Sequence, residues 1–131
     1  MSDIHEIRTD DAPPAIGPYA QAVRVGNLVY TSGQIGMKPG TTEIVAGGFE
    51  PQAVQVLANL KAVLAAAGCT FGDVVKTTIF VADMDDFARL NELYGEAMGA
   101  HRPARSTVQA ARLPKDALVE IEMIVRVPDA S

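Results

Sequence analysis

The spacing of hydrophobic residues changes along the chain, and the changes mark where strands and helices are expected. Apolar and polar positions alternate in residues 20–25 and again in residues 28–35, which predicts two strands. The Gly26-Asn27 pair between them is typical of a tight β-hairpin turn. Residues 4–7 fit a short edge strand ahead of this hairpin.

Two later stretches have apolar residues at the spacing of an α-helix. The first is expected to begin near Glu50-Pro51, since proline suits the first helical position, and to end at Gly68. The second follows the capping carboxylates of residues 83–86. The apolar positions expected to face the core are Val54, Leu57, Leu60, Leu64 and Ala67 in the first helix, and Phe87, Leu90, Tyr94 and Met98 in the second.

Asn91 falls in the middle of the apolar stripe of the second helix, where a polar side chain needs an explanation. A buried amide without partners costs about 1–3 kcal/mol. Asn91 is therefore expected to bond to the adjacent backbone; the alternative is that it faces a polar pocket.

Two of the later predicted strands differ in how they are covered. Residues 74–81 are rich in β-branched side chains and apolar on both faces, as expected for an interior strand. In residues 119–127 the odd positions are apolar, and Glu120 and Glu122 share the other face with Ile124. Because this face is partly apolar and 48% of the chain is hydrophobic, we expect another subunit to cover it.

The order of elements is strand, strand, helix, strand, helix, strand, strand. This order predicts an α+β sandwich with both helices on one face of the sheet and the other face open to association. A chain of 131 residues is long enough for one core and too short for two ordinary domains. We therefore expect residues 1–131 to form a single domain.

Composition and charge narrow the classes of function. A net charge of −5, with 11 Lys and Arg scattered along the chain, disfavours nucleic acid and anionic membrane surfaces as partners. The N-terminus lacks the features of a signal peptide and no apolar stretch is suited to a membrane span, so a cytoplasmic protein is expected. Cys69 is interpreted as a packing residue, and His5 and His101 as surface residues without metal-ligand spacing, so no metal is implied.

Residues 103–125 carry the most specific chemistry. Arg105 begins one predicted strand and Glu120 lies in the next, so a fixed cation and a carboxylate are available for a small anionic substrate and a water. An ordinary hairpin would pair these two residues directly. Periodicity does not distinguish Glu120 from Glu122, because both project the same way. Gly33 interrupts an earlier strand, which indicates either a β-bulge or the close approach of a ligand.

Several ordered motifs together resemble those of the RidA family (YjgF/YER057c/UK114), and the likeness runs from about residue 12 to residue 127. The motifs are Ala15-Ile-Gly-Pro-Tyr-Ala-Gln-Ala22, Ser32-Gly-Gln-Ile35, Asp73-Val-Val-Lys-Thr-Thr-Ile-Phe80, Asp86-Phe-Ala88 with Asn91 and Tyr94, Pro103-Ala-Arg-Ser106, and Leu113-Pro-Lys-Asp-Ala-Leu-Val-Glu-Ile-Glu122.

The resemblance implies a chorismate-mutase-like fold, a mixed β-sheet with two helices packed on one face, assembled as a homotrimer with three clefts between subunits. It implies a 2-iminobutanoate/2-iminopropanoate deaminase, which hydrolyses enamines and imines released by pyridoxal-phosphate enzymes to 2-keto acids and ammonia. The family uses no cofactor. In its fold the last strand is central, so Arg105 and Glu120 are not expected to be simple hairpin partners.

The resemblance also assigns roles by position. The family's carboxylate-binding arginine falls on Arg105, and its water-positioning glutamate falls on Glu120 in preference to Glu122. Other residues that line the family's cleft correspond to Tyr19, Gly33, Asn91 and Thr107. Some members carry cysteine where this chain has Thr107, so a thiol has no role at this position here.

Two other classes of function stay open on the sequence. A non-catalytic trimer that binds small carboxylates in a regulatory role would need Arg105 but not Glu120. A ribonuclease activity is attributed to some relatives, but the acidic balance of this chain disfavours it because phosphate contacts need clustered Lys and Arg.

Overall fold

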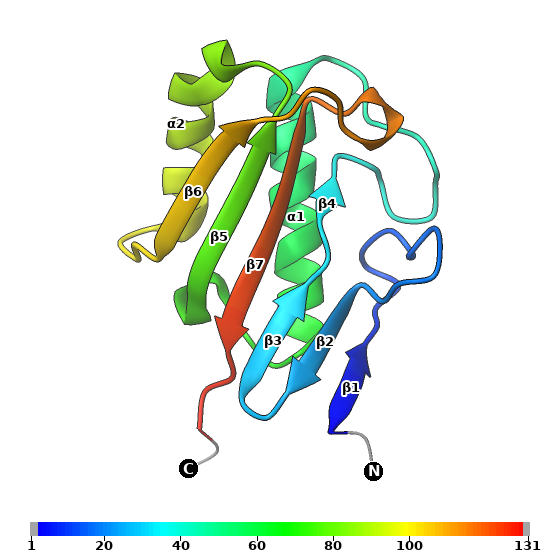
Figure 1. Cartoon of the computed structure of the whole chain (residues 1–131), viewed down its shortest axis with the longest axis vertical. Coiled ribbons are helices and arrows are strands. Elements are labelled where there is room, and N and C mark those ends of the chain that lie inside the picture. The colour runs from blue at the N-terminus through cyan, green and yellow to red at the C-terminus, as the bar shows by residue number, and fades with distance from the viewer. Residues whose placement is uncertain (1–2, 130–131) are drawn as a thin grey trace.

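The last strand of the chain, β7 (Val119–Arg126), lies at the centre of the sheet (Figure 1). The computed structural model describes residues 3–129. On one side β7 pairs antiparallel with β5 (Val74–Val81), and on the other with β3 (Leu28–Thr31) and then β4 (Gln34–Ile35). The odd residues of β7 are buried, which confirms the predicted alternation.

The strands farther from the centre complete a mixed sheet. Beyond β3 lie β2 (Ala22–Val25) and the edge strand β1 (Ile4–Ile7), and the two residues Gly26-Asn27 connect β2 to β3 as predicted. At the opposite edge β6 (Ala104–Gln109) pairs with β5 and runs parallel to it. The predicted interior position of the 74–81 strand is therefore confirmed, since β5 has a partner on each side.

Helices α1 (Phe49–Ala66) and α2 (Phe87–Met98) both lie behind the sheet in Figure 1. Short 3₁₀ helices η1 (Phe71–Asp73), η2 (Met84–Asp86) and η3 (Pro114–Asp116) precede β5, α2 and β7. Gly68, with φ 75°, follows the end of α1 as predicted. Cys69 is buried in the core cluster between helices and sheet, which confirms its packing role. The predicted mixed α+β fold, with two helices on one face, is confirmed.

The predicted inward faces of the helices are partly wrong. Val54 is 52% exposed and Phe87 is 36% exposed. In α1 the polar residues Gln52 and Asn59 face inward instead, because each satisfies loop backbone. Gln52 Oε1 accepts from Leu118 N at 2.8 Å, and Asn59 Nδ2 donates to the Met37 carbonyl at 2.8 Å. The apolar stripe therefore does not define the whole buried face of α1.

The strand expected over residues 28–35 is broken at Ser32-Gly33. Tyr30 pairs with Ile124 and Gln34 pairs with Ile121. The chain therefore advances four residues from Tyr30 to Gln34 while β7 advances only three. The extra residue is a bulge between β3 and β4, as one of the two explanations of Gly33 predicted.

No helix within residues 3–129 is long and apolar enough to cross a membrane.

Candidate functional site

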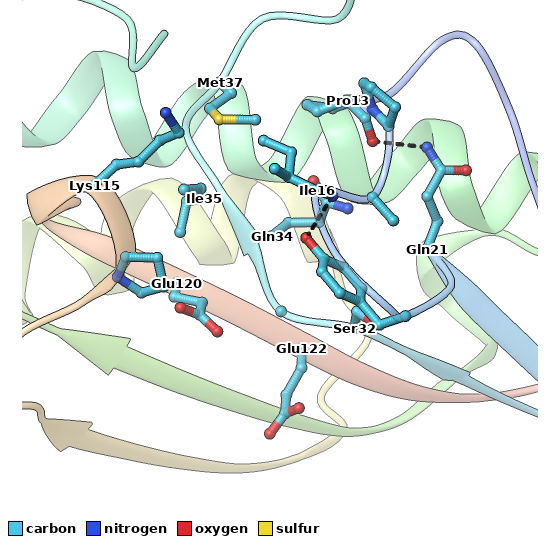
Figure 2. Close-up of a pocket in the computed structure, with 15 residues that line it drawn as sticks. Pro13, Ile16, Gln21, Ser32, Gln34, Ile35, Met37, Lys115, Glu120 and Glu122 are labelled. Carbon is cyan, nitrogen blue, oxygen red and sulfur yellow. Dashed lines mark hydrogen bonds between the residues drawn. The ribbon is translucent and has the colours of Figure 1, made fainter. Parts of the chain in front are cut away.

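A cavity of about 560 Å³ lies where the loop before β2, strand β4, η3 and β7 meet (Figure 2). Its walls carry Tyr19 from the loop, Gly33 and Ile35 around the bulge, and Glu120 and Glu122 from β7. These residues come from three separated segments of the sequence, which the central position of β7 brings together.

Glu120 approaches the backbone at Gly33 more closely than any side chain there would allow. A Cβ added at Gly33 would overlap Glu120 Oε2 and lie 2.8 Å from Glu120 Cδ. Gly33 therefore serves two purposes, the bulge and the space for this carboxylate. Burial raises the pKa of the Glu120 carboxyl, and the nearby negative charge of Glu122 raises it further.

The side chain of Gln21 anchors the loop that carries Tyr19. Gln21 Nε2 donates to the Pro13 carbonyl at 2.8 Å, and Gln21 Oε1 accepts from Thr9 N at 2.8 Å. Within the loop, Tyr19 Oη accepts from Ile16 N at 3.2 Å. Tyr19 is 52% exposed while it lines the cavity, so one side of its ring remains available to a ligand or a partner.

On the remaining wall, the turn at η3 has two left-handed residues in succession. Lys115 has φ 56° and Asp116 has φ 54°, a conformation that costs roughly 1–2 kcal/mol per residue for side chains other than glycine. The Asp116 carboxylate accepts from Arg112 Nε at 2.7 Å, and Asp116 N donates to the Leu113 carbonyl at 3.0 Å. These bonds hold the turn and place Lys115 on the cavity wall.

A second cluster surrounds Arg105 at the edge of the sheet. Arg105 Nη2 donates to Asn91 Oδ1 at 2.7 Å. The guanidinium lies 5.1 Å from the ring centre of Tyr94 and 5.5 Å from that of Phe87, within the range of cation–π attraction. Phe87, Asn91 and Tyr94 share one face of α2, so this helix holds the arginine in place.

Three hydroxyl groups, those of Thr77, Tyr94 and Thr107, lie on the same face of the sheet as Arg105. Tyr94 Oη donates to Thr77 Oγ1 at 2.9 Å. Burial raises the pKa of Tyr94, while its hydrogen bond to Thr77 and the charge of Arg105 act in the opposite direction. Thr107 Oγ1 is buried and has no hydrogen-bond partner within residues 3–129. An unpaired buried hydroxyl costs about 1–3 kcal/mol, so a ligand or a neighbouring chain that bonds to it would be favoured.

The predicted site residues therefore form two groups on opposite faces of the sheet. Arg105 pairs with Thr77 and lies on the helix face, whereas Glu120 pairs with Phe80 and lies on the open face. The first group is Arg105, Asn91 and Thr107, and the second is Glu120, Gly33 and Tyr19. Asn91 bonds to the Arg105 side chain, so the expectation of a bond to adjacent backbone was wrong.

Several residues around these groups were missed or misassigned from the sequence. Phe87 was expected in the core but is 36% exposed, whereas Tyr94 is buried in the core cluster as expected, and its ring also contacts Arg105. Gln21 and Lys115 lie within the motifs quoted above, but no periodic pattern marked them.

Within residues 3–129, no group of three or more His, Cys, Asp or Glu side chains is arranged to hold a metal ion. Neither histidine therefore belongs to such a group. His101 was expected at the surface but is half-buried, with Nε2 2.7 Å from the Val74 carbonyl. His5 is exposed, as expected.

Comparison with known proteins identifies the family. Residues 9–127 match the family model described as Endoribonuclease L-PSP. A RutC family protein of Pyrococcus horikoshii is 51% identical over 118 residues, which are 90% of this chain and 94% of that one. The human 2-iminobutanoate/2-iminopropanoate deaminase is 48% identical over 118 residues, 90% of this chain and 86% of its own. The chain belongs to the RidA family.

The structural comparison agrees with this assignment. The crystal structure of RidA from the Antarctic bacterium Psychrobacter superposes with a TM-score of 0.90 at 49% identity, over 94% of this chain and 99% of that one. RidA membership confirms the family resemblance seen in the motifs, and the fold it implied is the one observed.

Proposed function

We propose that this RidA protein is a hydrolytic deaminase of 2-imino acids and their enamine tautomers, such as 2-iminopropanoate and 2-aminoacrylate. The observation that carries the proposal is Glu120, a carboxylate with a raised pKa on the wall of a cavity, beside a glycine that leaves it room. A carboxylate with a raised pKa is a stronger base for water, as hydrolysis of a C=N bond requires. The human deaminase, 48% identical, bears the name of this activity.

We further propose that the protein acts as a homotrimer, with the site in the cleft between two subunits. Arg105 and Glu120 lie on opposite faces of one sheet, so a second copy must supply one of them to a shared substrate. Tyr30, level with Ile124 on β7, and Val108, level with Phe80 on β5, are exposed on the open face, which gives a neighbouring chain apolar surface to bury.

In the proposed mechanism, Arg105 binds the carboxylate of the imino acid. The nitrogens not bonded to Asn91 Oδ1 remain for the paired hydrogen bonds that a guanidinium makes with a carboxylate. Thr107, at the same edge, presents its unpartnered hydroxyl to the substrate. Tyr19 and the backbone at Gly33 form the opposite wall of the cleft.

Glu120 orients a water molecule and takes its proton as the water oxygen bonds to the carbon of the protonated C=N group. The carbon–nitrogen π electrons move to nitrogen and give a carbinolamine. Glu120 returns the proton to that nitrogen and then takes the proton of the carbinolamine hydroxyl, so the oxygen electrons form the C=O bond as the C–N bond breaks. Ammonia and the 2-keto acid leave, and Glu120 passes the remaining proton to ammonia or solvent. No oxidant, reductant or cofactor enters this balance.

The family description names an endoribonuclease, but the site favours small imines over RNA. Two carboxylates, Glu120 and Glu122, face the same cavity, and the chain carries a net charge of −5. An RNA backbone needs clustered cations. We therefore propose no nucleic-acid partner.

A coupled assay tests the proposal. A serine or threonine dehydratase generates the imine, and release of keto acid and ammonia is measured above the spontaneous rate. Wild-type protein should accelerate release, and Arg105→Ala and Glu120→Gln should abolish most of the acceleration. Arg126→Ala and Glu43→Gln, outside both groups, are matched controls. Binding of 2-keto acids without any acceleration would instead identify a regulatory, carboxylate-binding trimer.

A further inference from the structure

Lys115 lies on the cavity wall, and no residue among 3–129 pairs with its positive charge. Its ammonium makes no hydrogen bond or ion pair with any of residues 3–129. Its backbone, φ 56° and ψ 25°, is in the left-handed region, which non-glycine residues rarely adopt and which recurs at ligand-binding sites. The backbone of Lys115 therefore adopts this conformation at some energetic cost.

The side chain of Lys115 is not needed to hold its own turn. The Arg112–Asp116 ion pair and the backbone bond from Ala117 N to the Pro114 carbonyl, 3.0 Å, close the turn. Leu118, the residue after Ala117, is held by a hydrogen bond from its backbone N to Gln52 Oε1. The structure holds Lys115 in place from both sides and leaves its ammonium available.

Lys115 does not neutralise the glutamates of the cavity. Burial and the charge of Glu122 raise the pKa of Glu120, and the Lys115 ammonium forms no ion pair with either glutamate. Figure 2 shows the ammonium of Lys115 directed toward Met37 and away from Glu120 and Glu122. The cation and the reacting end of the site are therefore separated.

The cavity surface between Lys115 and the two glutamates is apolar. Ile35, Met37 and Pro114 line the same cavity. At about 560 Å³ the cavity falls in the range of pockets that hold drug-sized ligands, roughly 300–1,000 Å³. The cavity is therefore larger than a three-carbon imino acid needs. The additional space is bounded by an apolar wall, and Lys115 lies at the end of that wall.

We propose that Lys115 is a specificity residue for 2-imino dicarboxylates, imino acids whose aliphatic side chain ends in a carboxylate. This inference rests on the proposed function. With the reacting carbon at Glu120, the aliphatic segment lies along Ile35 and Met37, and the distal carboxylate accepts hydrogen bonds from Lys115. The charges then balance, because the two substrate carboxylates meet two cations, Arg105 and Lys115.

The test compares two imines that differ only in the charge of the side-chain end. Amino acid oxidases acting on glutamate and glutamine generate 2-iminoglutarate and its uncharged amide, 2-iminoglutaramate, and kcat/KM is measured for each. In wild-type protein the acid should exceed the amide by about tenfold, the effect of one charge-assisted hydrogen bond. Lys115→Asn should abolish this preference, since asparagine tolerates the left-handed backbone and carries no charge.

Two further variants serve as controls. Lys115→Arg should keep most of the preference for the acid, and Lys38→Asn, at an exposed lysine outside the cavity, should not alter it. An equal loss of kcat/KM for acid and amide in Lys115→Asn would show a merely structural role and overturn the inference.

A separate substrate keeps this test distinct from that of the proposed function. If wild-type protein accelerates 2-iminopropanoate but shows no preference for the acid over the amide, the specificity inference is wrong and the deaminase proposal stands. If no imine is accelerated, the deaminase proposal fails, and calorimetry with 2-oxoglutarate and 2-oxoglutaramate decides the inference. Equal affinity for both ligands would then overturn it.

Discussion

Arg105 and Glu120 lie on opposite faces of one sheet, with strand β5 between the strands that carry them. Arg105 is level with Thr77 and shares its helix-covered face, whereas Glu120 is level with Phe80 and shares the open face. Neither side chain can reach the other's surroundings while the sheet is intact. A site that uses both residues therefore requires two copies of the chain.

Asn91 and the rings of α2 orient the Arg105 guanidinium, so each should affect substrate binding through Arg105. Asn91→Ala removes the hydrogen bond at 2.7 Å and should raise KM for 2-iminopropanoate by about tenfold, the value of a charge-assisted hydrogen bond. The effect on kcat should be smaller, because Glu120 is untouched. Steady-state kinetics in the dehydratase-coupled assay measure both constants. A fall in kcat at unchanged KM would contradict this assignment.

Arg105→Lys should resemble Arg105→Ala more than wild-type protein. Lysine keeps the charge but loses the planar donor pair, its contact with Asn91 and its stacking on Phe87 and Tyr94. We expect kcat/KM to fall by at least about tenfold. Retention of wild-type kcat/KM by Arg105→Lys would mean that charge alone binds the substrate.

Two glycines near the bulge should respond differently to alanine. At Gly33 the added Cβ meets the Glu120 carboxylate, a side chain that can move away, so Gly33→Ala should reduce turnover with little loss of stability. At Gly36 the added Cβ would lie 2.8 Å from Gln52 Cα, in helix α1, so Gly36→Ala should destabilise the fold by about 1–3 kcal/mol.

Urea unfolding and the coupled assay, run on both variants, check this contrast between the two glycines. A Gly33→Ala variant that unfolds as readily as Gly36→Ala, or that retains full turnover, would contradict it.

The pH profile of turnover should depend on Glu122. Glu120 must be ionised to accept a proton from water, and its pKa is raised, so kcat/KM should fall as the pH drops through that raised value. Glu122→Gln removes the smaller of the two causes and should move this acid limb to lower pH. Burial, the larger cause, remains, so the shift should be partial. An acid limb that stays in place or moves upward would contradict the assignment of the base.

The same shift in the Glu120 pKa affects stability. The folded state binds the proton more tightly than the unfolded chain, so folding stability should decline as the pH rises from the ordinary glutamate pKa through the raised one. Glu120→Gln should remove this decline. Thermal unfolding over that pH range measures the decline in stability. If the decline is the same in Glu120→Gln as in wild-type protein, the pKa of Glu120 is not raised in the assembled protein.

Thr107→Val tests whether the buried hydroxyl of Thr107 has a partner in the assembly. If it has none, replacing it with a methyl group should raise the free energy of unfolding by about 1 kcal/mol, because an unsatisfied polar group is removed. Thr107→Ser keeps the hydroxyl and is the control. Destabilisation by Thr107→Val, seen without substrate, would indicate that a neighbouring subunit bonds to the hydroxyl.

Local sequence patterns predicted most of the fold and only part of the site. The alternation in β7, the turn at Gly26-Asn27 and the interior strand β5 follow from short-range rules, and each is confirmed. The pairing of β7 with β3 and β5 is long-range. Periodicity alone favoured a hairpin of the last two strands, and the family resemblance corrected it.

The errors in the helices and at Asn91 have one cause. A helical wheel assigns a residue to the core when apolar neighbours flank it, but Phe87 and Asn91 on α2 contact Arg105 on strand β6. Likewise Gln52 and Asn59 point inward because loops distant in sequence need their amides. Partners that lie far apart in sequence leave no periodic signal.

The central claim is that each active cleft takes Arg105 from one subunit and Glu120 from its neighbour, and subunit mixing tests it most directly. Arg105→Ala and Glu120→Gln homotrimers should each be nearly inactive on 2-iminopropanoate. Unfolded together in equal amounts and refolded, they should regain about a quarter of wild-type turnover, because random assembly places both native residues in that share of clefts. Mixed trimers, verified by native mass spectrometry, that remain as inactive as the parents would contradict a shared site.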